Sequence, residues 1–359
     1  MTAMVLLVAL FQALLMSMSI GPVRAPVAAT PPDSSAPPTT TVKLVFIHHS
    51  TGGYWLADVG ENDLAGGLGR ALSNTNYFVS ATNYGWGPNG VGDRTDIPNW
   101  PEWFTGADRG AIMQAVYDEG DQNIGDYGNW GRRSVMPAGE NTIIVFKSCF
   151  PNSDMYGNPD DAPLATPDDS LTVANAKAVY NTILMYFATR PDKLFIVITA
   201  PPLAQGDYPP DSVSAAHRAA NARAFNDWLM NNWLATYPFK NVAVFDYYNV
   251  MTSNGGNPNA TDVGWVNGNH HRWLASTGAV QHQKTVNNNY AKYPSGDSHP
   301  NTVGQQKATT EFVPLLNVFY HRWKATAVTL NRFVYLPVAQ HDSDPGMTRS
   351  PIHALSRPQ

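Results

Sequence analysis

Short apolar runs alternate along the chain with longer segments whose apolar residues recur at helical spacing. Five runs are almost continuously apolar and rich in β-branched residues; they are residues 42–47, 77–82, 141–147, 193–199 and 241–247. Strands that are buried on both faces of a parallel sheet have this pattern. Helical spacing appears in residues 170–190, 214–237 and 302–323. The alternation predicts a single α/β domain with a five-stranded parallel sheet and right-handed crossovers.

Two long segments interrupt this alternation. Residues 83–140 are rich in Gly, Trp and Asp and contain one helical pattern, near 108–119, while residues 252–296 are dominated by Asn, Gly and His. Loops of this length in a compact domain are usually functional, and both segments follow expected strands. We therefore expect them to form the walls of a site at the carboxyl edge of the sheet.

The two ends of the chain differ from the middle. Residues 4–20 are almost continuously apolar and are followed by small residues at 27–29, which predicts a signal peptide over 1–29, with an uncleaved anchor as the alternative. Residues 30–41 have the composition of a Pro/Ser/Thr linker that is too polar to pack. We expect a secreted or cell-surface protein with no stable membrane insertion after signal cleavage.

The domain itself is expected over residues 42–325, with a partly disordered C-terminal extension over 326–359. The extension contains one apolar run, residues 332–338, which is interpreted as a late edge strand or a segment for surface attachment.

Composition narrows the possible partners. The net charge is −5 and charged residues make up 14% of the chain, so there is no basic surface of the kind that binds nucleic acid. Cys149 is the sole cysteine, which excludes an internal disulfide. We expect a small molecule or a polysaccharide as the ligand, and neither a metal nor another cofactor.

Polar side chains suited to catalysis follow several of the expected strands. Ser50 comes just after the first strand, Gly85 after the second and Asn152 after the third. Asp297 and His299 directly precede the last helical segment. Because the carboxyl ends of parallel strands share one edge of a sheet, we expect these groups to gather on one rim.

Acyl transfer requires groups of these kinds. A serine hydroxyl becomes an effective nucleophile when an imidazole takes its proton, and a carboxylate holds that imidazole in the useful tautomer. The oxyanion of the tetrahedral intermediate needs donors that already point at it. The backbone N–H groups of Ser50 and Gly85 and the side-chain amide of Asn152 are the candidate donors.

The order of these residues resembles the SGNH/GDSL hydrolase family of esterases and lipases, over about residues 42–323. The resemblance implies a flavodoxin-like three-layer α/β/α sandwich. It also implies that Ser50 is the nucleophile, His299 the base and Asp297 the acid that orients it. Gly85 and Asn152 then correspond to the family's oxyanion-hole positions.

Two blocks depart from the family pattern. His48 and His49 precede Ser50 where the family has Gly-Asp, and Asp297 lies two residues before His299 where the family's acid lies three before. A Ser-His dyad whose ring is oriented by a backbone carbonyl therefore stays open as an alternative.

The expected function is that of a secreted serine esterase, acting on carboxylic esters such as acetylated carbohydrates. A non-catalytic glycan-binding module on the same fold is the main alternative. A metal-dependent hydrolase is another, because His48-His49 and His270-His271 are adjacent pairs; neighbouring residues at a strand end point to opposite faces, which argues against it for the first pair.

Other residues have two interpretations each. Ser50 also suits a helix N-cap, and Cys149 is a rival nucleophile or a small buried apolar residue. Trp86, His270 and His271 are candidate substrate contacts in the long loops. A local core for the tryptophan and a solvated loop for the histidines are the alternatives.

Overall fold

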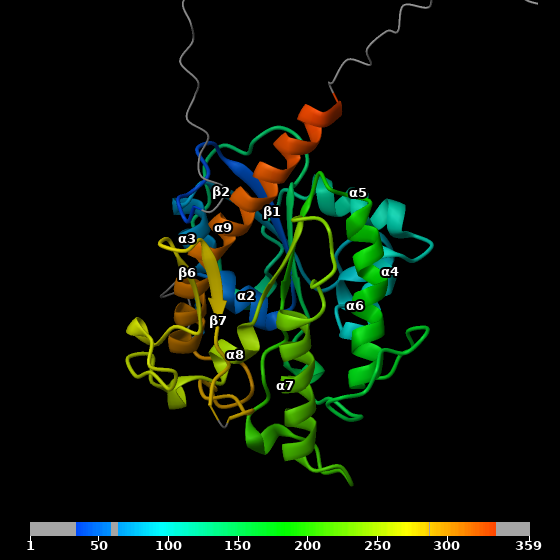
Figure 1. Cartoon of the computed structure of the whole chain (residues 1–359), viewed down its shortest axis with the longest axis vertical. Helices are drawn as coiled ribbons and strands as arrows, with labels where there is room; N and C mark the ends of the chain where they lie inside the picture. Colours follow the sequence, from blue (N-terminus) through cyan, green and yellow to red (C-terminus); the bar gives the residue numbers. More distant parts are fainter. Residues whose placement is uncertain (1–33, 59–63, 287, 335–359) are drawn as a thin grey trace, which may run out of the picture.

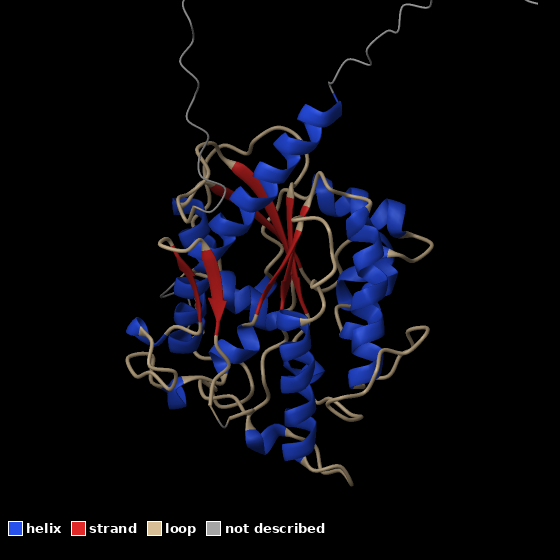
Figure 2. Cartoon of the chain, viewed as in Figure 1, coloured by secondary structure: helices blue, strands red, loops and turns tan. Residues whose placement is uncertain are grey.

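The computed structural model describes residues 34–58, 64–286 and 288–334. Its centre is a five-stranded parallel sheet, which Figures 1 and 2 show with helices on both sides. The strands are β1 (Val42–Ile47), β2 (Tyr77–Thr82), β3 (Ile143–Lys147), β4 (Leu194–Ile198) and β5 (Val242–Phe245). Their order across the sheet is β2-β1-β3-β4-β5. This is the flavodoxin-like order, so the three-layer α/β/α prediction is confirmed.

Helices of the described residues cover both faces of the sheet. They are α2 (Ser50–Leu56), α3 (Leu68–Asn74), α4 (Trp100–Phe104), α5 (Arg109–Asp118), α6 (Val173–Ala188), α7 (Ala215–Asn231), α8 (Tyr247–Met251) and α9 (Thr302–Val334). Apolar residues of α2, α3 and α9 pack on one face, and those of α4, α5, α6 and α7 pack on the other. The helical segments that periodicity predicts all occur.

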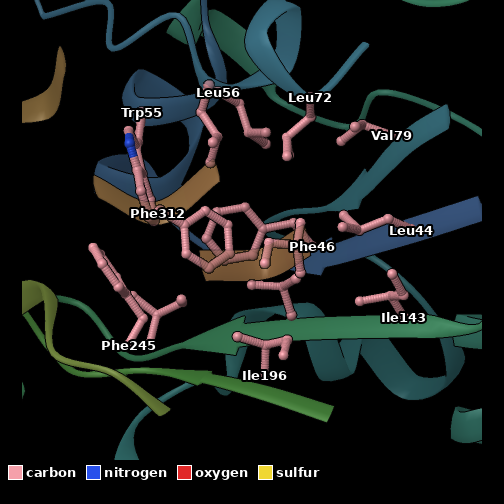
Figure 3. Packing of buried hydrophobic residues seen from close by; sticks show 14 of the residues in the cluster. Leu44, Phe46, Trp55, Leu56, Leu72, Val79, Ile143, Ile196, Phe245 and Phe312 are labelled. Atoms are coloured by element: carbon pink, nitrogen blue, oxygen red, sulfur yellow. The ribbon is translucent and has the colours of Figure 1, made fainter. Parts of the chain in front are cut away.

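The pleat of the strands divides the core into two layers. In β1, Leu44 and Phe46 belong to the layer that contains α2 and α9; Figure 3 shows Phe46 near Phe312 and Leu44 near Ile143. Val45, between them, belongs to the opposite layer. Successive residues of a strand point to opposite faces, so a strand between two helical layers must be apolar at every position. This explains why the strands were recognisable as continuous apolar runs.

The strand prediction is too long at β5. The apolar run predicts a strand to residue 247, whereas β5 ends at Phe245 and α8 begins at Tyr247. Asp246 ends the strand because its carboxylate caps α8, accepting a hydrogen bond from the Asn249 backbone N–H at 3.1 Å.

The prediction that residues 30–41 do not pack is wrong for the described part, residues 34–41. The Ser35 and Pro38 carbonyls accept hydrogen bonds from the side chains of Asn317 and Asn76, at 2.8 and 2.7 Å. A proline-containing segment still offers its carbonyl oxygens, and the body of the domain supplies the donors. The predicted signal peptide lies outside the described residues.

The prediction of an edge strand over residues 332–338 is wrong for residues 332–334, because α9 continues through Val334. The predicted domain end at residue 325 therefore falls inside this helix. Residues 335–359 lie outside the described part. Among the helices of the described ranges, none has both the length and the apolar character needed to span a bilayer.

The two long segments contain more structure than the sequence predicts. Residues 83–140 include α4 as well as the expected α5. Residues 252–296 contain an antiparallel hairpin of β6 (His271–Leu274) and β7 (Ala279–His282). The hairpin strands are partly exposed and carry many polar residues, so their sequence lacks the apolar signature of the central strands.

Candidate active site

Ser50 lies at the junction between β1 and α2. The strand ends at Ile47, His49 has an extended backbone and occupies the N-cap position, and α2 begins at Ser50 itself. Ser50 is therefore the first residue of the helix and not its cap. A sharp strand-to-helix turn of this kind presents a serine hydroxyl above the sheet edge.

Two glycines allow this short helix to pack closely. A Cβ atom at Gly52 would collide with the His48 side chain, and one at Gly53 would collide with the ring of Tyr127. The Gly52-Gly53 pair after Ser50-Thr51 is therefore required by the close approach of α2 to its neighbours.

Ser50 and His299 meet although they are far apart in the sequence. The Ser50 hydroxyl donates a hydrogen bond to His299 Nε2 at 2.8 Å. The other ring nitrogen, Nδ1, donates to an Asp297 carboxylate oxygen at 2.9 Å. The contacts expected between these three residues are present, and they have the arrangement of a nucleophile, a base and an orienting carboxylate.

The turn that carries Asp297 and His299 is held by its own backbone. The Ser295 N–H donates to the His299 carbonyl at 2.9 Å, and the His299 N–H donates to Asp297 Oδ1 at 2.9 Å. The intervening Ser298 donates to the Asp207 carboxylate at 2.6 Å, which ties the turn to the loop after β4. The two-residue spacing therefore brings the carboxylate to the ring.

The surroundings of the imidazole favour an ionised acid. Burial acts to raise the pKa of Asp297, but hydrogen bonds from His299 outweigh it and the pKa is lowered. The rings of Tyr54 and Phe150 pack edge-on against the imidazole, with centroids at 5.6 and 4.8 Å. Two aromatic rings thus contact the imidazole, while the carboxylate, with 57% of its side chain exposed, stays in contact with water.

Cys149 lies beside the serine. Its Sγ is 3.5 Å from Ser50 Oγ and 3.2 Å from Thr51 Oγ1. Burial acts to raise the pKa of the thiol, but the nearby Lys147 and the contacts with Ser50 and Thr51 outweigh it, so the pKa is lowered. The imidazole nevertheless contacts the hydroxyl, which favours Ser50 over Cys149 as the nucleophile.

The assignment of Gly85 as an oxyanion donor is wrong in this structure. Its backbone N–H donates to Asp93 Oδ1 at 2.8 Å, within the turn that follows β2. Gly85 has a φ of 69°, in the left-handed region that glycine adopts without strain. Its role is that of a turn residue, which its sequence position fits equally well.

Asn152 also has other partners. Its Nδ2 donates to Asp96 at 2.6 Å, and its Oδ1 accepts from the Ile97 N–H at 2.7 Å. Both partners belong to the long 83–140 segment. The Asn152 side chain therefore anchors this segment to the end of β3, and one of the two N–H groups of its amide is engaged by Asp96.

Tyr84 is the residue that the sequence pattern missed. Its ring stacks on His49 at 3.8 Å between centroids, and its phenol lies close enough to Ser50 for Ser50 to act on its pKa. Burial raises the pKa of Tyr84, so the phenol keeps its proton. The sequence signal was its position in the "NYGWG" turn immediately after β2. The family resemblance selects the neighbouring Gly85 as the candidate from this turn instead.

His48 and His49 are buried and point to different partners. His48 Nδ1 donates to the His49 carbonyl at 2.7 Å, while His49 Nδ1 contacts Thr95 Oγ1 at 3.0 Å and its Nε2 contacts the Gly92 carbonyl. Burial lowers the pKa of His48 to about 3, so this imidazole is neutral. These contacts of His48 and His49 stabilise the turn before Ser50.

Trp86 belongs to the local core of the 83–140 segment. Its ring stacks on Trp103 with centroids 5.9 Å apart, and its Nε1 donates to Glu119 at 2.5 Å. This placement matches the local-core interpretation and does not fit a substrate platform. Aromatic residues of this segment pack against strand residues in the core on one face of the sheet.

His270 and His271 are buried, so their assignment as substrate contacts on the Ser50 rim does not fit. The backbone N–H groups of both donate to Glu311 Oε2, at 3.0 and 2.8 Å. His270 Nε2 contacts Asp262 at 2.6 Å. Carboxylates from α9 and from the segment itself hold the two histidines inside the fold.

Comparisons with known proteins add little. No protein-family profile matches the chain, and no curated protein sequence matches it. A crystal structure of another protein is similar over 77% of this chain and 96% of its own, at 11% identity and a TM-score of 0.34. The fold assignment rests instead on the strand order and the two helical layers.

Proposed function

We propose that this protein is a secreted serine esterase that resembles the SGNH/GDSL hydrolases. The observation that carries the proposal is the chain of contacts from the Ser50 hydroxyl to His299 at 2.8 Å and from His299 to Asp297 at 2.9 Å. Secretion and a carbohydrate ester as substrate rest on the apolar N-terminal sequence and the resemblance to this family.

The chemistry follows from these three groups. As Ser50 Oγ bonds to the ester carbonyl carbon, its proton moves to His299 Nε2 and the carbonyl oxygen becomes an oxyanion. The tetrahedral intermediate then collapses: the bond to the alcohol breaks, and His299 returns the proton to the departing alcohol oxygen. The acyl group is left on Ser50.

Water completes the cycle. His299 takes a proton from water as the water oxygen bonds to the acyl carbon, and collapse of this second intermediate breaks the bond to Ser50 Oγ. The proton returns to Ser50 and the carboxylic acid leaves. Asp297 stays ionised throughout and stabilises the imidazolium that forms in each half-reaction.

The decisive experiment is hydrolysis of short aryl acetates and acetylated glycans by Ser50→Ala. We expect the variant to lose at least about 10³-fold in kcat, because the nucleophile is removed. Cys149→Ala is the matched control, since it removes the neighbouring thiol; we expect it to stay within about tenfold of wild type.

The reverse outcome, with activity kept by Ser50→Ala and lost by Cys149→Ala, would make the thiol the nucleophile. Full activity in both variants would reject the mechanism.

One observation favours the non-catalytic alternative. Of the two oxyanion donors expected from the resemblance, the Gly85 N–H is bonded to Asp93, and one N–H of the Asn152 amide is bonded to Asp96. A glycan-binding module would need no oxyanion hole. Binding of an acetylated glycan by the wild type, without any release of acetate, would favour this alternative over the esterase.

A further inference from the structure

A second cluster of reactive side chains lies outside the Ser50, His299 and Asp297 group. Asp246 follows β5, His271 begins β6 and His282 ends β7. One ligand atom from each of the three lies within 4.8 Å of the others. The β6-β7 hairpin, which packs against α9 (Figure 1), brings the two histidines to the end of the central sheet.

The spacing of the donor atoms suits a tetrahedral ion. Asp246 Oδ2 and His282 Nε2 are 3.0 Å apart. Ligand bonds of about 2.0–2.1 Å at a tetrahedral zinc place two donor atoms about 3.3 Å apart. His271 Nε2 accepts a hydrogen bond of 3.3 Å from the Asp246 backbone N–H, so its ring must turn away from this donor to bind an ion together with the other two side chains.

Neighbouring groups lie behind two of the three side chains, Asp246 and His271. Asp246 Oδ1 accepts hydrogen bonds from Thr199 Oγ1 and the Asn249 N–H, at 3.0 and 3.1 Å, which leaves Oδ2 directed at the histidines. His271 Nδ1 lies 3.6 Å from a Glu311 carboxylate oxygen. A carboxylate behind a ligating imidazole is a common feature of metal sites, because it fixes the tautomer and ring orientation.

One member of the cluster borders a cavity. His282 lines a cavity of about 570 Å³ that is also bounded by Val244, Trp265 and Arg322. The His282 side chain is 11% exposed, whereas those of Asp246 and His271 are buried. A metal held by the three side chains would therefore have its fourth position on the cavity side, open to water or a ligand.

We propose that Asp246, His271 and His282 form a binding site for a divalent transition-metal ion, with Zn²⁺ as the ion that best fits two imidazoles and a carboxylate. The ion would link the β6-β7 hairpin to the end of β5.

The test is calorimetric titration of the full chain with ZnCl₂, using protein made without a polyhistidine tag and freed of metal with a chelator. We expect one equivalent of Zn²⁺ to bind with a Kd tighter than about 1 µM. His282→Gln should weaken binding at least tenfold, because it removes a ligand while keeping a group that can donate to Asp246. No saturable binding by the wild type would overturn the proposal.

Two control variants locate the ion. His217→Gln changes an exposed histidine of α7 and should leave the Kd unchanged. His299→Gln should also leave it unchanged; loss of binding there, with binding kept in His282→Gln, would place the ion at the Ser50 site and reject the proposal. Zinc should also raise the Tm of the wild type but not that of His282→Gln. A cooperative thermal transition of His282→Gln without zinc shows that the variant is folded. None of these measurements depends on ester hydrolysis.

Discussion

Two nucleophilic atoms, Ser50 Oγ and Cys149 Sγ, lie 3.5 Å apart where β1 and β3 end. What distinguishes them is the imidazole, which accepts a hydrogen bond from the hydroxyl. At the scale of single residues, the chemistry is therefore decided by where His299 points. The sequence predicted this pairing because both residues adjoin regular elements whose ends meet at one edge of the sheet.

The expected oxyanion donors were a weaker prediction for a physical reason. Position after a strand predicts that Gly85 and Asn152 reach the rim, but it does not reveal whether their N–H groups already have acceptors. Those acceptors, Asp93 and Asp96, lie in a segment with little periodicity. Tyr84 went unrecognised because a phenol on a glycine-rich turn leaves no repeating pattern.

Tyr84→Phe tests whether the phenol replaces the missing donor. Tyr84 lies close enough to Ser50 for the two to affect each other electrostatically, and a phenol O–H is a suitable oxyanion donor. We expect kcat for aryl acetates to fall about 10- to 100-fold with KM nearly unchanged, because the contact strengthens in the transition state. A rise in kcat would instead mean that the hydroxyl obstructs the acyl oxygen.

At the scale of elements, sequence and structure agree best where burial is complete. Strands β1 and β2 begin and end where the apolar runs predict, because two helical layers require an apolar residue at every position. The β6-β7 hairpin was missed because its strands are half-exposed and contain polar residues. Long-range contacts of His271 and His282 hold it, and local sequence does not display them.

The β1-α2 junction should make the protein sensitive to mild acid. Burial lowers the pKa of His48 from 6.5 to about 3. A base whose pKa is depressed in the folded state stabilises the fold above its unfolded pKa, and this contribution is lost as the pH falls toward the folded pKa. We expect the free energy of unfolding to decrease between about pH 6.5 and 3, by up to about 5 kcal/mol from this residue.

His48→Asn removes this titration while its amide still donates to the His49 carbonyl. We expect the variant to be less stable near neutral pH, because it leaves a cavity, but its stability should change less between pH 6.5 and pH 4. Urea unfolding at several pH values measures both effects, with the exposed-residue variant His217→Gln as the control. Parallel curves for wild type and His48→Asn would contradict the assignment.

At the scale of the whole molecule, segments that are far apart in the sequence contact each other through α9. This helix carries core residues for one face of the sheet, and the turn with His299 directly precedes it. The described residues before β1 also pack on α9 through Asn317 and His321. Composition predicted that residues 30–41 form a free linker. Composition does not show that side chains of α9 donate hydrogen bonds to the backbone carbonyls of this segment.

Asn317 is the residue at which these parts meet. Its Oδ1 accepts a hydrogen bond of 2.8 Å from the Tyr77 hydroxyl at the start of β2, and its Nδ2 donates at 2.8 Å to the Ser35 carbonyl. The Tyr77 ring is fully buried, so its hydroxyl has no water to replace a lost partner. We expect Asn317→Ala to lower the free energy of unfolding by about 1–3 kcal/mol in urea.

A double-mutant cycle with Tyr77→Phe separates this bond from a general loss of packing. In Tyr77→Phe the hydroxyl is already absent, so Asn317→Ala should cost about 1 kcal/mol less there than in the wild type. The surface variant Asn231→Ala, whose side chain bonds to the Asp227 carbonyl within α7, should change stability by no more than about 0.5 kcal/mol. Additive losses would mean that Asn317 acts through the Ser35 carbonyl and helix packing alone, and that β2 and α9 are joined by apolar contacts without this polar link.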